Sequence, residues 1–89
     1  MNVRVRLFAS LREAAGRSEI LLDLPPGATV EAAWRALAGA HPALEGRRPS
    51  LSAAVNRRYV SFEASLEEAD ELVFVPPVSG GASVSSTSR

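Results

Sequence analysis

Only one stretch of this chain has the period of a long amphipathic helix, and this feature limits the possible folds most. Its apolar residues recur every three or four positions and form one stripe: Val30, Ala33, Trp34, Leu37 and Ala38. Thr29 stands at the expected N-cap, with Glu31 in the first turn. Gly39 and Pro42 supply the stop signals. A helix with a single apolar face must pack against another layer, and Trp34 is its expected anchor in the core.

The other apolar residues follow the pattern of β-strands. Val3, Val5 and Leu7 alternate with polar positions, which is typical of a half-buried strand. Further strands are predicted over 19–24, 51–56, 59–62 and 72–75, with Arg57-Arg58 as a turn, a short helix or turn over 9–15 and a loop over 41–50. One helix packed across one mixed sheet buries these faces, so the sequence predicts an α+β domain.

Size and composition exclude several classes of protein. A chain of 89 residues fits one domain with a thin core. Ten basic and ten acidic residues cancel, which argues against binding nucleic acid or an anionic membrane through bulk charge. The chain has no cysteine, so disulfides, thiolate nucleophiles and cysteine metal sites are excluded. It has no basic-then-apolar leader and no apolar run of membrane length, so a cytoplasmic location is expected.

The segment Pro76-Pro77-Val78-Ser79-Gly80-Gly81 carries the most functional information. Two prolines cannot continue a central strand and favour an extended backbone. The two glycines have no side chains, so their backbone can enter a channel too narrow for other residues. We therefore expect a folded domain over 1–78, a flexible functional tail over 79–81 and a disordered Ser-rich extension over 82–89.

Four short segments resemble one family of proteins. They are Leu-Phe-Ala-Ser-Leu-Arg-Glu at 7–13, Ala-Ala-Val-Asn at 53–56, Asp-Glu-Leu at 70–72 and Pro-Pro-Val-Ser-Gly-Gly at 76–81. From Asn2 through Gly81 the chain resembles MoaD-like proteins, the small subunits of molybdopterin synthase in the MoaD/ThiS superfamily of ubiquitin-like sulfur carriers. The resemblance implies a β-grasp fold, in which one main helix packs across a mixed sheet.

The resemblance also implies a chemical cycle at Gly81, next to Gly80. A MoeB-like E1 adenylyltransferase uses ATP to adenylate the terminal carboxylate, and a sulfurtransferase replaces AMP with sulfur to give a thiocarboxylate. The tail then delivers sulfur to the molybdopterin precursor in a MoaE-like large subunit, within an expected heterotetramer. This chain would be a carrier and not an enzyme, with the catalytic residues on the large subunit and no cofactor or metal of its own.

A docking surface for these partners is predicted on the first strand and near the tail. Phe8 is in phase with Arg4 and Arg6, so an aromatic side chain lies on the polar face, where it is a candidate contact. The resemblance places Tyr59 and Val75 with Phe8 in an apolar patch that contacts both the E1-like enzyme and the large subunit. The remaining predicted partner contacts are in the tail: Pro76, Pro77, Val78 and Ser79.

The sequence departs from the family pattern at two places. Ala69 stands where the turn before the last strand usually has glycine, so a different backbone shape is expected there. Ala82 follows Gly81, and a backbone amide has no free carboxylate to adenylate. Residues 82–89 could be removed by a protease, be an artefact, or be the remnant of a fusion to the large subunit; removal or an artefact is our hypothesis.

Other functions remain open at this point. The sulfur could serve thiamine, cysteine or tRNA thiolation, the chain could be a ubiquitin-like protein modifier, or it could be an interaction module without tail chemistry. All ten basic residues are arginine, so the chain cannot accept an isopeptide bond on a lysine side chain. His41, the acidic run at 67–71 and the pairs Arg47-Arg48 and Arg57-Arg58 are read as solvated or structural.

Overall fold

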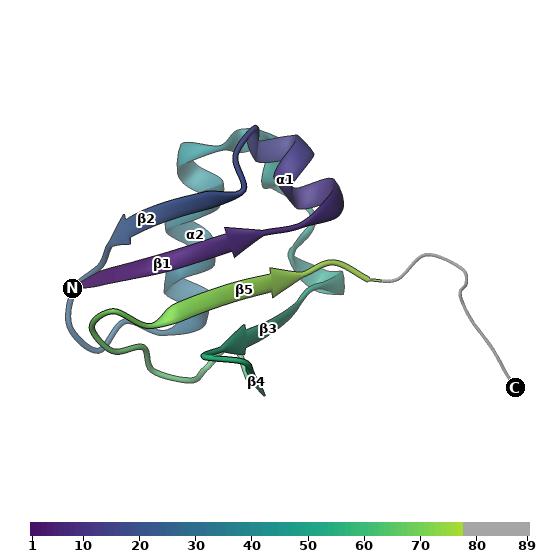
Figure 1. Ribbon diagram of the computed structural model, residues 1–89. Helices are drawn as coiled ribbons and strands as arrows, with labels where there is room; N and C mark the ends of the chain where they lie inside the picture. The colour runs from purple at the N-terminus through teal and green to yellow at the C-terminus, as the bar shows by residue number, and fades with distance from the viewer. Residues whose placement is uncertain (78–89) are drawn as a thin grey trace, which may run out of the picture.

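The computed structural model describes residues 1–77, which form one mixed sheet with helices packed against it (Figure 1). The strands are β1 (Asn2–Leu7), β2 (Glu19–Asp23), β3 (Ser52–Val55), β4 (Arg58–Val60) and β5 (Glu71–Val75). The helices are α1 (Ala9–Ala15), α2 (Val30–Ala40) and the short 3-10 turns η1 (Pro42–Leu44) and η2 (Arg48–Ser50). The predicted order of elements and the predicted fold class are confirmed.

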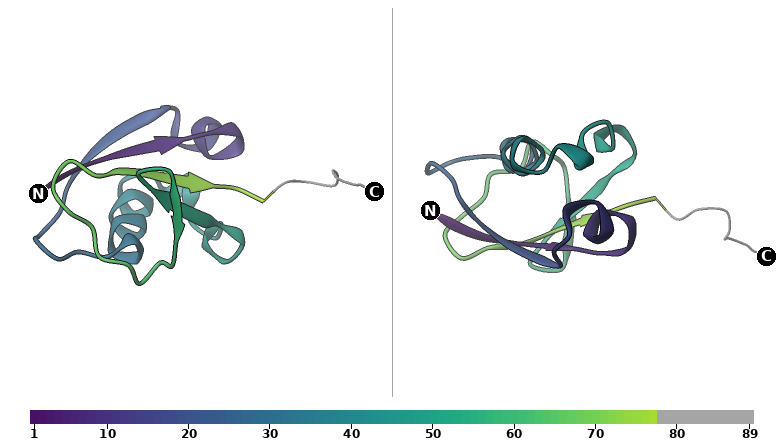
Figure 2. Two further views of the ribbon diagram at one scale, coloured as in Figure 1. Left: turned by 60° about the horizontal axis from the view of Figure 1, so that its bottom comes forward. Right: turned by 90° about the horizontal axis from the view of Figure 1, so that it is seen from above.

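The sheet has the strand order β2-β1-β5-β3-β4. The first and last strands, β1 and β5, are parallel neighbours at its centre, and every other pairing is antiparallel. Figures 1 and 2 show α2 lying across one face of the sheet, whereas among residues 1–77 no helix covers the opposite face. We call this opposite side the open face. Because β5 is central, the chain leaves the sheet from its middle, beside α1.

The core lies between α2 and the sheet. Val3, Val5 and Leu7 are buried, as their alternation predicts. The whole apolar stripe of α2 is also buried, and Thr29 accepts a hydrogen bond from the amide of Ala32 at 3.1 Å, as an N-cap should. The helix ends at His41, because Pro42 disfavours helical backbone at the residue before it. Gly39 was wrongly expected to stop the helix, since it lies within the last turn.

Aromatic side chains form the centre of this core. The rings of Trp34 and Phe74 meet edge to face, with centroids 5.0 Å apart, and the ring of Phe62 stacks on Phe74 at 5.8 Å. Phe74 is fully buried, and only 4% of the surface of Trp34 is exposed. The predicted role of Trp34 as a core anchor is confirmed, but its main partner comes from β5, the strand that leads into the tail.

The turn between β3 and β4 differs by one residue from the prediction. It consists of Asn56 and Arg57, both with positive φ (50° and 72°), which is the geometry of a tight hairpin of two strands. Arg58, expected in the turn, begins β4 and pairs with Val55. The Asn56 side chain holds the turn through Asp70 at 2.9 Å and through the amide of Glu71 at 3.0 Å. Bonds to a distant segment therefore help to hold this turn.

The turn before β5 keeps the left-handed backbone that a glycine would favour. Ala69 has φ of 69°, so the expectation of a different shape at this position was wrong. The amide of Ala69 donates to the Asn2 carbonyl at 2.8 Å, and the Glu67 amide donates to the Asp70 carboxylate at 2.7 Å. These bonds hold the turn although left-handed backbone costs an alanine about 1–2 kcal/mol.

We expect Ala69→Gly to stabilise the domain by about 0.5–1 kcal/mol. Glycine removes the left-handed strain but increases the entropy of the unfolded chain, and the two effects partly cancel. Ala36→Gly is the matched control: Ala36 is exposed inside α2, where the same change should destabilise by about 1 kcal/mol. Chemical denaturation of both variants measures the difference. If Ala69→Gly is as destabilising as Ala36→Gly, the strain does not exist.

Candidate functional site

The open face of the sheet carries a row of side chains that crosses four strands. Arg6 pairs with Val73, Val73 with Ala54, and Ala54 with Tyr59. Since side chains alternate along a strand, all four lie opposite the core positions Leu7 and Phe74. The row therefore changes from a charged residue on β1 to an aromatic residue on β4.

The neighbouring row lies closer to the tail. Val75 pairs with Ser52, and Phe8 directly follows Leu7, whose partner is Phe74. If this register is continued by one residue, Phe8 is opposite Val75. Phe8 is 47% exposed and Tyr59 is 74% exposed, which is uncommon for large hydrophobic side chains, while Val75 is half-buried. The five apolar residues of the two rows form what we call the open-face patch: Phe8, Ala54, Tyr59, Val73 and Val75.

The structure thus places the three predicted docking residues on one face and adds two. Val73 and Ala54 were missed by the sequence analysis. For Val73 a signal existed, because it is an apolar residue on the polar phase of β5, which is the argument that selected Phe8. For Ala54 there was none, since its position depends on the pairing of β3 with both neighbours. That this patch binds partners stays a prediction.

The exposure of Phe8 follows from the way in which β1 turns into α1. Phe8 has extended backbone at the N-cap, and Ala9 directly after it has φ of 51°, in the left-handed region. The Phe8 carbonyl then accepts from the amides of Leu11 and Arg12, at 3.1 and 3.4 Å. Leu11 is buried beneath the turn, and the Phe8 ring stays outside, 5.8 Å from the guanidinium carbon of Arg6.

Ion pairs border the patch on β1. Arg4 contacts Glu19 at 3.1 Å and Arg6 contacts Glu71 at 3.4 Å. Both pairs are largely exposed, so each contributes less than about 1 kcal/mol to stability. These ion pairs limit the extent of the open-face patch toward β1 and β2.

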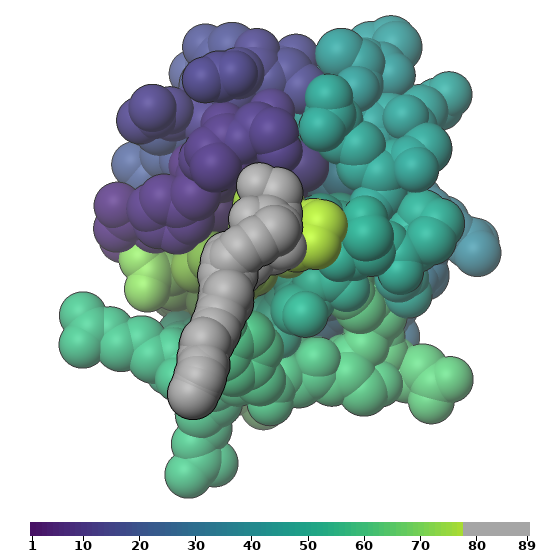
Figure 3. Space-filling model, turned by 90° about the vertical axis from the view of Figure 1, so that its right-hand side faces the viewer, coloured from purple at the N-terminus to yellow at the C-terminus, as the bar shows by residue number. Residues whose placement is uncertain are grey.

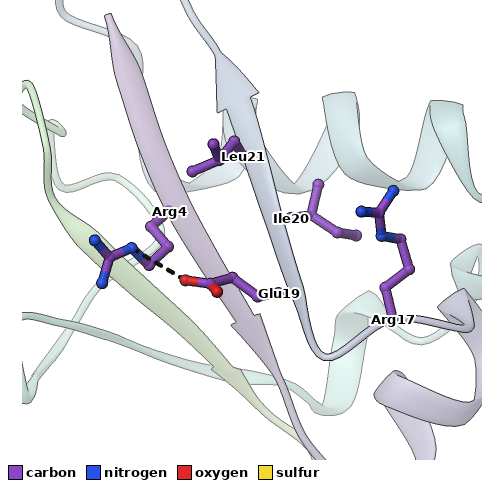
Figure 4. Close-up of a pocket in the computed structure, with 5 residues that line it drawn as sticks. All are labelled: Arg4, Arg17, Glu19, Ile20 and Leu21. Carbon is purple, nitrogen blue, oxygen red and sulfur yellow. Dashed lines mark ion pairs between the residues drawn. The ribbon is translucent and has the colours of Figure 1, made fainter.

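A broad hollow of about 660 Å³ lies beside β2 and is shown in Figure 4. Arg4, Glu19 and Leu21 lie on one side of the strand, whereas Ile20 and Arg17 lie on the other. The charged groups therefore do not converge on one point, and Arg4 and Glu19 already neutralise each other. We assign no ligand to this hollow. Leu21, 71% exposed, nevertheless provides an apolar reference residue outside the open-face patch.

Pro76 and Pro77 follow β5 directly and lead toward the predicted tail. Pro76 is half-buried and Pro77 is exposed. In Figure 3 the yellow end of the described chain emerges between the purple α1 segment and the teal segment that contains η1 and η2. The other predicted tail residues, Val78, Ser79, Gly80 and Gly81, lie outside the described residues, as does the extension over 82–89.

Within residues 1–77 no group of three acidic or histidine side chains is placed to hold a metal ion. None of the helices in this part of the chain is both long and apolar enough to cross a membrane. His41 caps the C-terminus of α2 and belongs to no such group.

Comparison with known proteins decides the family. The model of the ThiS family matches residues 5–81. The chain belongs to the ThiS family. The match includes the open-face patch and ends at Gly81, which is the residue that the sequence analysis singles out. The predicted resemblance to the MoaD/ThiS superfamily is confirmed.

Two curated relatives cover nearly the same range of this ThiS-family chain. The molybdopterin synthase sulfur carrier subunit of Arabidopsis thaliana is 35% identical over 81 residues, covering 91% of this chain and 84% of the relative. Small archaeal modifier protein 1 of Haloferax volcanii is 44% identical over 84 residues, covering 85% of this chain and 97% of the relative.

Solved structures confirm the β-grasp, ubiquitin-like fold. The crystal structure of SAMP1 from Haloferax volcanii matches with a TM-score of 0.84 at 36% identity, covering 91% of this chain and all of that one. A chain in the complex of subunits 1 and 2 of molybdopterin-converting factor from Helicobacter pylori 26695 matches with a TM-score of 0.65. The two chains are 21% identical, with 91% of this chain and 100% of that chain covered, and what they share is the fold.

Proposed function

We propose that this chain is the sulfur-carrier subunit of a molybdopterin synthase. The observation that carries the proposal is the family match, which extends through the Gly-Gly ending to Gly81. The name of the Arabidopsis relative, a molybdopterin synthase sulfur carrier subunit, supports the same function. The carrier supplies a chemically activated chain end, and the partners supply the catalytic groups.

The chemistry takes place at one carboxylate. The amide bond between Gly81 and Ala82 is first hydrolysed to free it. A MoeB-like enzyme then joins a carboxylate oxygen to the α-phosphorus of ATP and releases pyrophosphate. Sulfur at the oxidation level of hydrosulfide, delivered by a sulfurtransferase, attacks the acyl carbon and displaces AMP, which leaves a thiocarboxylate. This thioacid is a sulfur nucleophile, so the carrier needs no cysteine, and the chain has none.

The open-face patch suits the docking of these partners. It combines two exposed aromatic residues, Phe8 and Tyr59, with half-buried Val73 and Val75 on β5, the strand that leads toward the tail. Aromatic residues of this kind contribute most of the binding energy in many interfaces. The arrangement lets a large subunit of the MoaE type hold the sheet while the tail enters its active site. The chain of similar fold from Helicobacter pylori is part of a complex of two subunits.

The test is synthesis of molybdopterin from purified parts. A chain that ends at Gly81 is converted to the thiocarboxylate and mixed with the large subunit and the precursor. We expect product from the wild type. At limiting large subunit, we expect Phe8→Ala and Tyr59→Ala each to slow product formation about tenfold, because truncating a central aromatic contact costs about 1–2 kcal/mol.

Leu21→Ala is the matched control. It removes an apolar side chain about as exposed as that of Tyr59 from β2, outside the open-face patch, and should change the rate less than about twofold. Absence of product with the wild-type thiocarboxylate would contradict the proposed function. Equal effects of Phe8→Ala and Leu21→Ala would contradict only the role of the patch.

A second function has support from one comparison. The relative with 44% identity is named small archaeal modifier protein 1, so attachment of Gly81 to lysines of other proteins is the alternative. Adducts on proteins of a cell extract, formed by the activated wild type and not by a chain ending at Ser79, would favour that alternative. A chain that forms such adducts but yields no molybdopterin would replace the first proposal with the second.

A further inference from the structure

A small hollow of about 150 Å³ lies at the root of the tail. Four apolar residues supply part of its lining: buried Leu11 and Leu51, together with Pro76 and Pro77. Its polar lining consists of exposed Ser10, Arg47 and Ser50. These residues come from α1, from the segment around η2 and from the end of β5, which meet at the end of the molecule shown in Figure 3. We call this hollow the tail-root socket.

Arg47 is the charged residue of the socket, and the fold fixes its position. Its amide donates to the Leu44 carbonyl at 3.2 Å, and its own carbonyl accepts from the Ser50 hydroxyl at 3.4 Å. Its Nε donates to the Ala43 carbonyl at 3.3 Å. The two terminal nitrogens of the guanidinium are then left to bind another group.

No carboxylate among residues 1–77 forms an ion pair with Arg47. The neighbouring arginine provides a contrast. Arg48 lies 2.8 Å from a carboxylate oxygen of Glu31, and its guanidinium stacks 3.5 Å above the ring of Phe62. Arg48 is therefore a structural cross-link, whereas Arg47 offers a charge that the described part of the fold does not neutralise.

We infer that the tail-root socket receives an Asp or Glu side chain of the protein that takes up the tail. The inference rests on the proposed function. A guanidinium with free N–H groups, in the same hollow as the Ser10 hydroxyl, is complementary to a carboxylate, and charge-assisted bonds of this kind are the strong ones. The apolar lining accommodates the methylene groups of the acidic side chain.

The size of the socket distinguishes a side chain from a small-molecule ligand. Sites for cofactors and metabolites enclose about 300–1,000 Å³, so a nucleotide or a pterin does not fit into 150 Å³. A single Asp or Glu side chain fits into this volume.

The location points to the same partner. The four residues that follow Pro77, up to Gly81, span at most about 14 Å when extended. A protein that holds Gly81 in its active site must therefore bring the entrance of its channel close to Pro77, and hence against the socket. An acidic residue at that entrance would fix the direction in which the tail enters.

The experiment measures binding of the chain that ends at Gly81 to the large synthase subunit by calorimetry, at several salt concentrations. We expect Arg47→Gln to weaken binding about tenfold and Arg47→Glu more strongly, since each leaves a partner carboxylate unpaired or repelled. Arg47→Gln should also reduce the dependence of affinity on salt, which a merely structural role would not do.

Arg35→Gln is the matched control. Arg35 lies on α2, on the other side of the sheet from the open face, and its side chain is 79% exposed in an ion pair with Glu31 at 3.6 Å. This variant should bind within about twofold of the wild type. Thermal unfolding of the variants verifies that each is folded. If Arg47→Glu does not fold, the binding of Arg47→Gln alone tests the inference.

The outcomes separate the two proposals. If the wild type binds and Arg47→Gln binds equally well with the same salt dependence, the socket is not an acid-binding site and the proposed function stands. If the wild type does not bind the large subunit at all, the proposed function itself fails and the inference with it.

Discussion

A chain that ends at Ser79 should form no thiocarboxylate and support no molybdopterin synthesis, whereas the chain that ends at Gly81 should do both. Removing Gly80 and Gly81 shortens the extended tail by about 7 Å. Misplacing a reacting group by even about 1 Å can cost a hundredfold in rate, so activity should fall below detection. Mass spectrometry after incubation with the E1-like enzyme, ATP and a sulfur source measures the first step.

The length of the tail can be separated from the absence of side chains. A double variant with Gly80→Val and Gly81→Val keeps the reach but adds two branched side chains, which a channel shaped for bare backbone excludes. We expect this variant to be as inactive as the shortened chain. The uncut chain of 89 residues should also be inert, because its Gly81 carbonyl is part of an amide.

Complementation of a strain that lacks the natural carrier tests the same prediction in cells. Restoration of cofactor synthesis by the chain ending at Ser79, or by the double valine variant, would refute the proposal that a bare glycine end carries the sulfur. Activity of the uncut chain in a purified system, with no loss of residues 82–89, would refute the requirement for cleavage.

The second large effect concerns stability: Phe74→Ala should leave the domain mostly unfolded at 37 °C. Phe74 has no exposed surface and contacts both Trp34 and Phe62 through its ring. Replacing a buried phenylalanine by alanine costs about 3–5 kcal/mol, through lost transfer energy and the cavity that remains. A core in a domain of this size supplies only about 3–5 kcal/mol of net stability, so the loss removes most of it.

Guanidinium denaturation followed by circular dichroism measures this change. Phe74→Leu serves as the matched control, because it keeps most of the volume and should cost no more than about 1.5 kcal/mol. Phe8→Ala should change stability by less than about 0.5 kcal/mol, since Phe8 lies at the surface. A loss below 1 kcal/mol for Phe74→Ala would mean that the aromatic cluster is not the centre of the core.

Local patterns were sufficient for much of the fold. The stripe on α2 and the alternation on β1 were read correctly because burial of one face imposes a period that is visible in the sequence. The turns were read less well. Gly39 fits inside a helix whose end is set by Pro42, and the hairpin at Asn56 and Arg57 depends on bonds from Asn56 to Asp70 and Glu71.

For the candidate site, the sequence by itself predicted the tail and determined the exposed phase of Phe8. Both depend only on residue type and on neighbours along the chain: glycine has no side chain, proline cannot continue a strand, and alternate residues of a strand point to opposite faces. Tyr59 and Val75 were predicted from the family resemblance and not from a local pattern.

The tertiary structure alone decided which of these residues are neighbours. Ala54 and Val73 join the open-face patch because β5 lies between β1 and β3, an order that no local pattern specifies. The tail-root socket likewise joins Ser10, Arg47 and Pro76, which are more than 25 residues apart along the chain. Such contacts depend on how strands pair and on how α2 covers the sheet, and these are properties of the whole core.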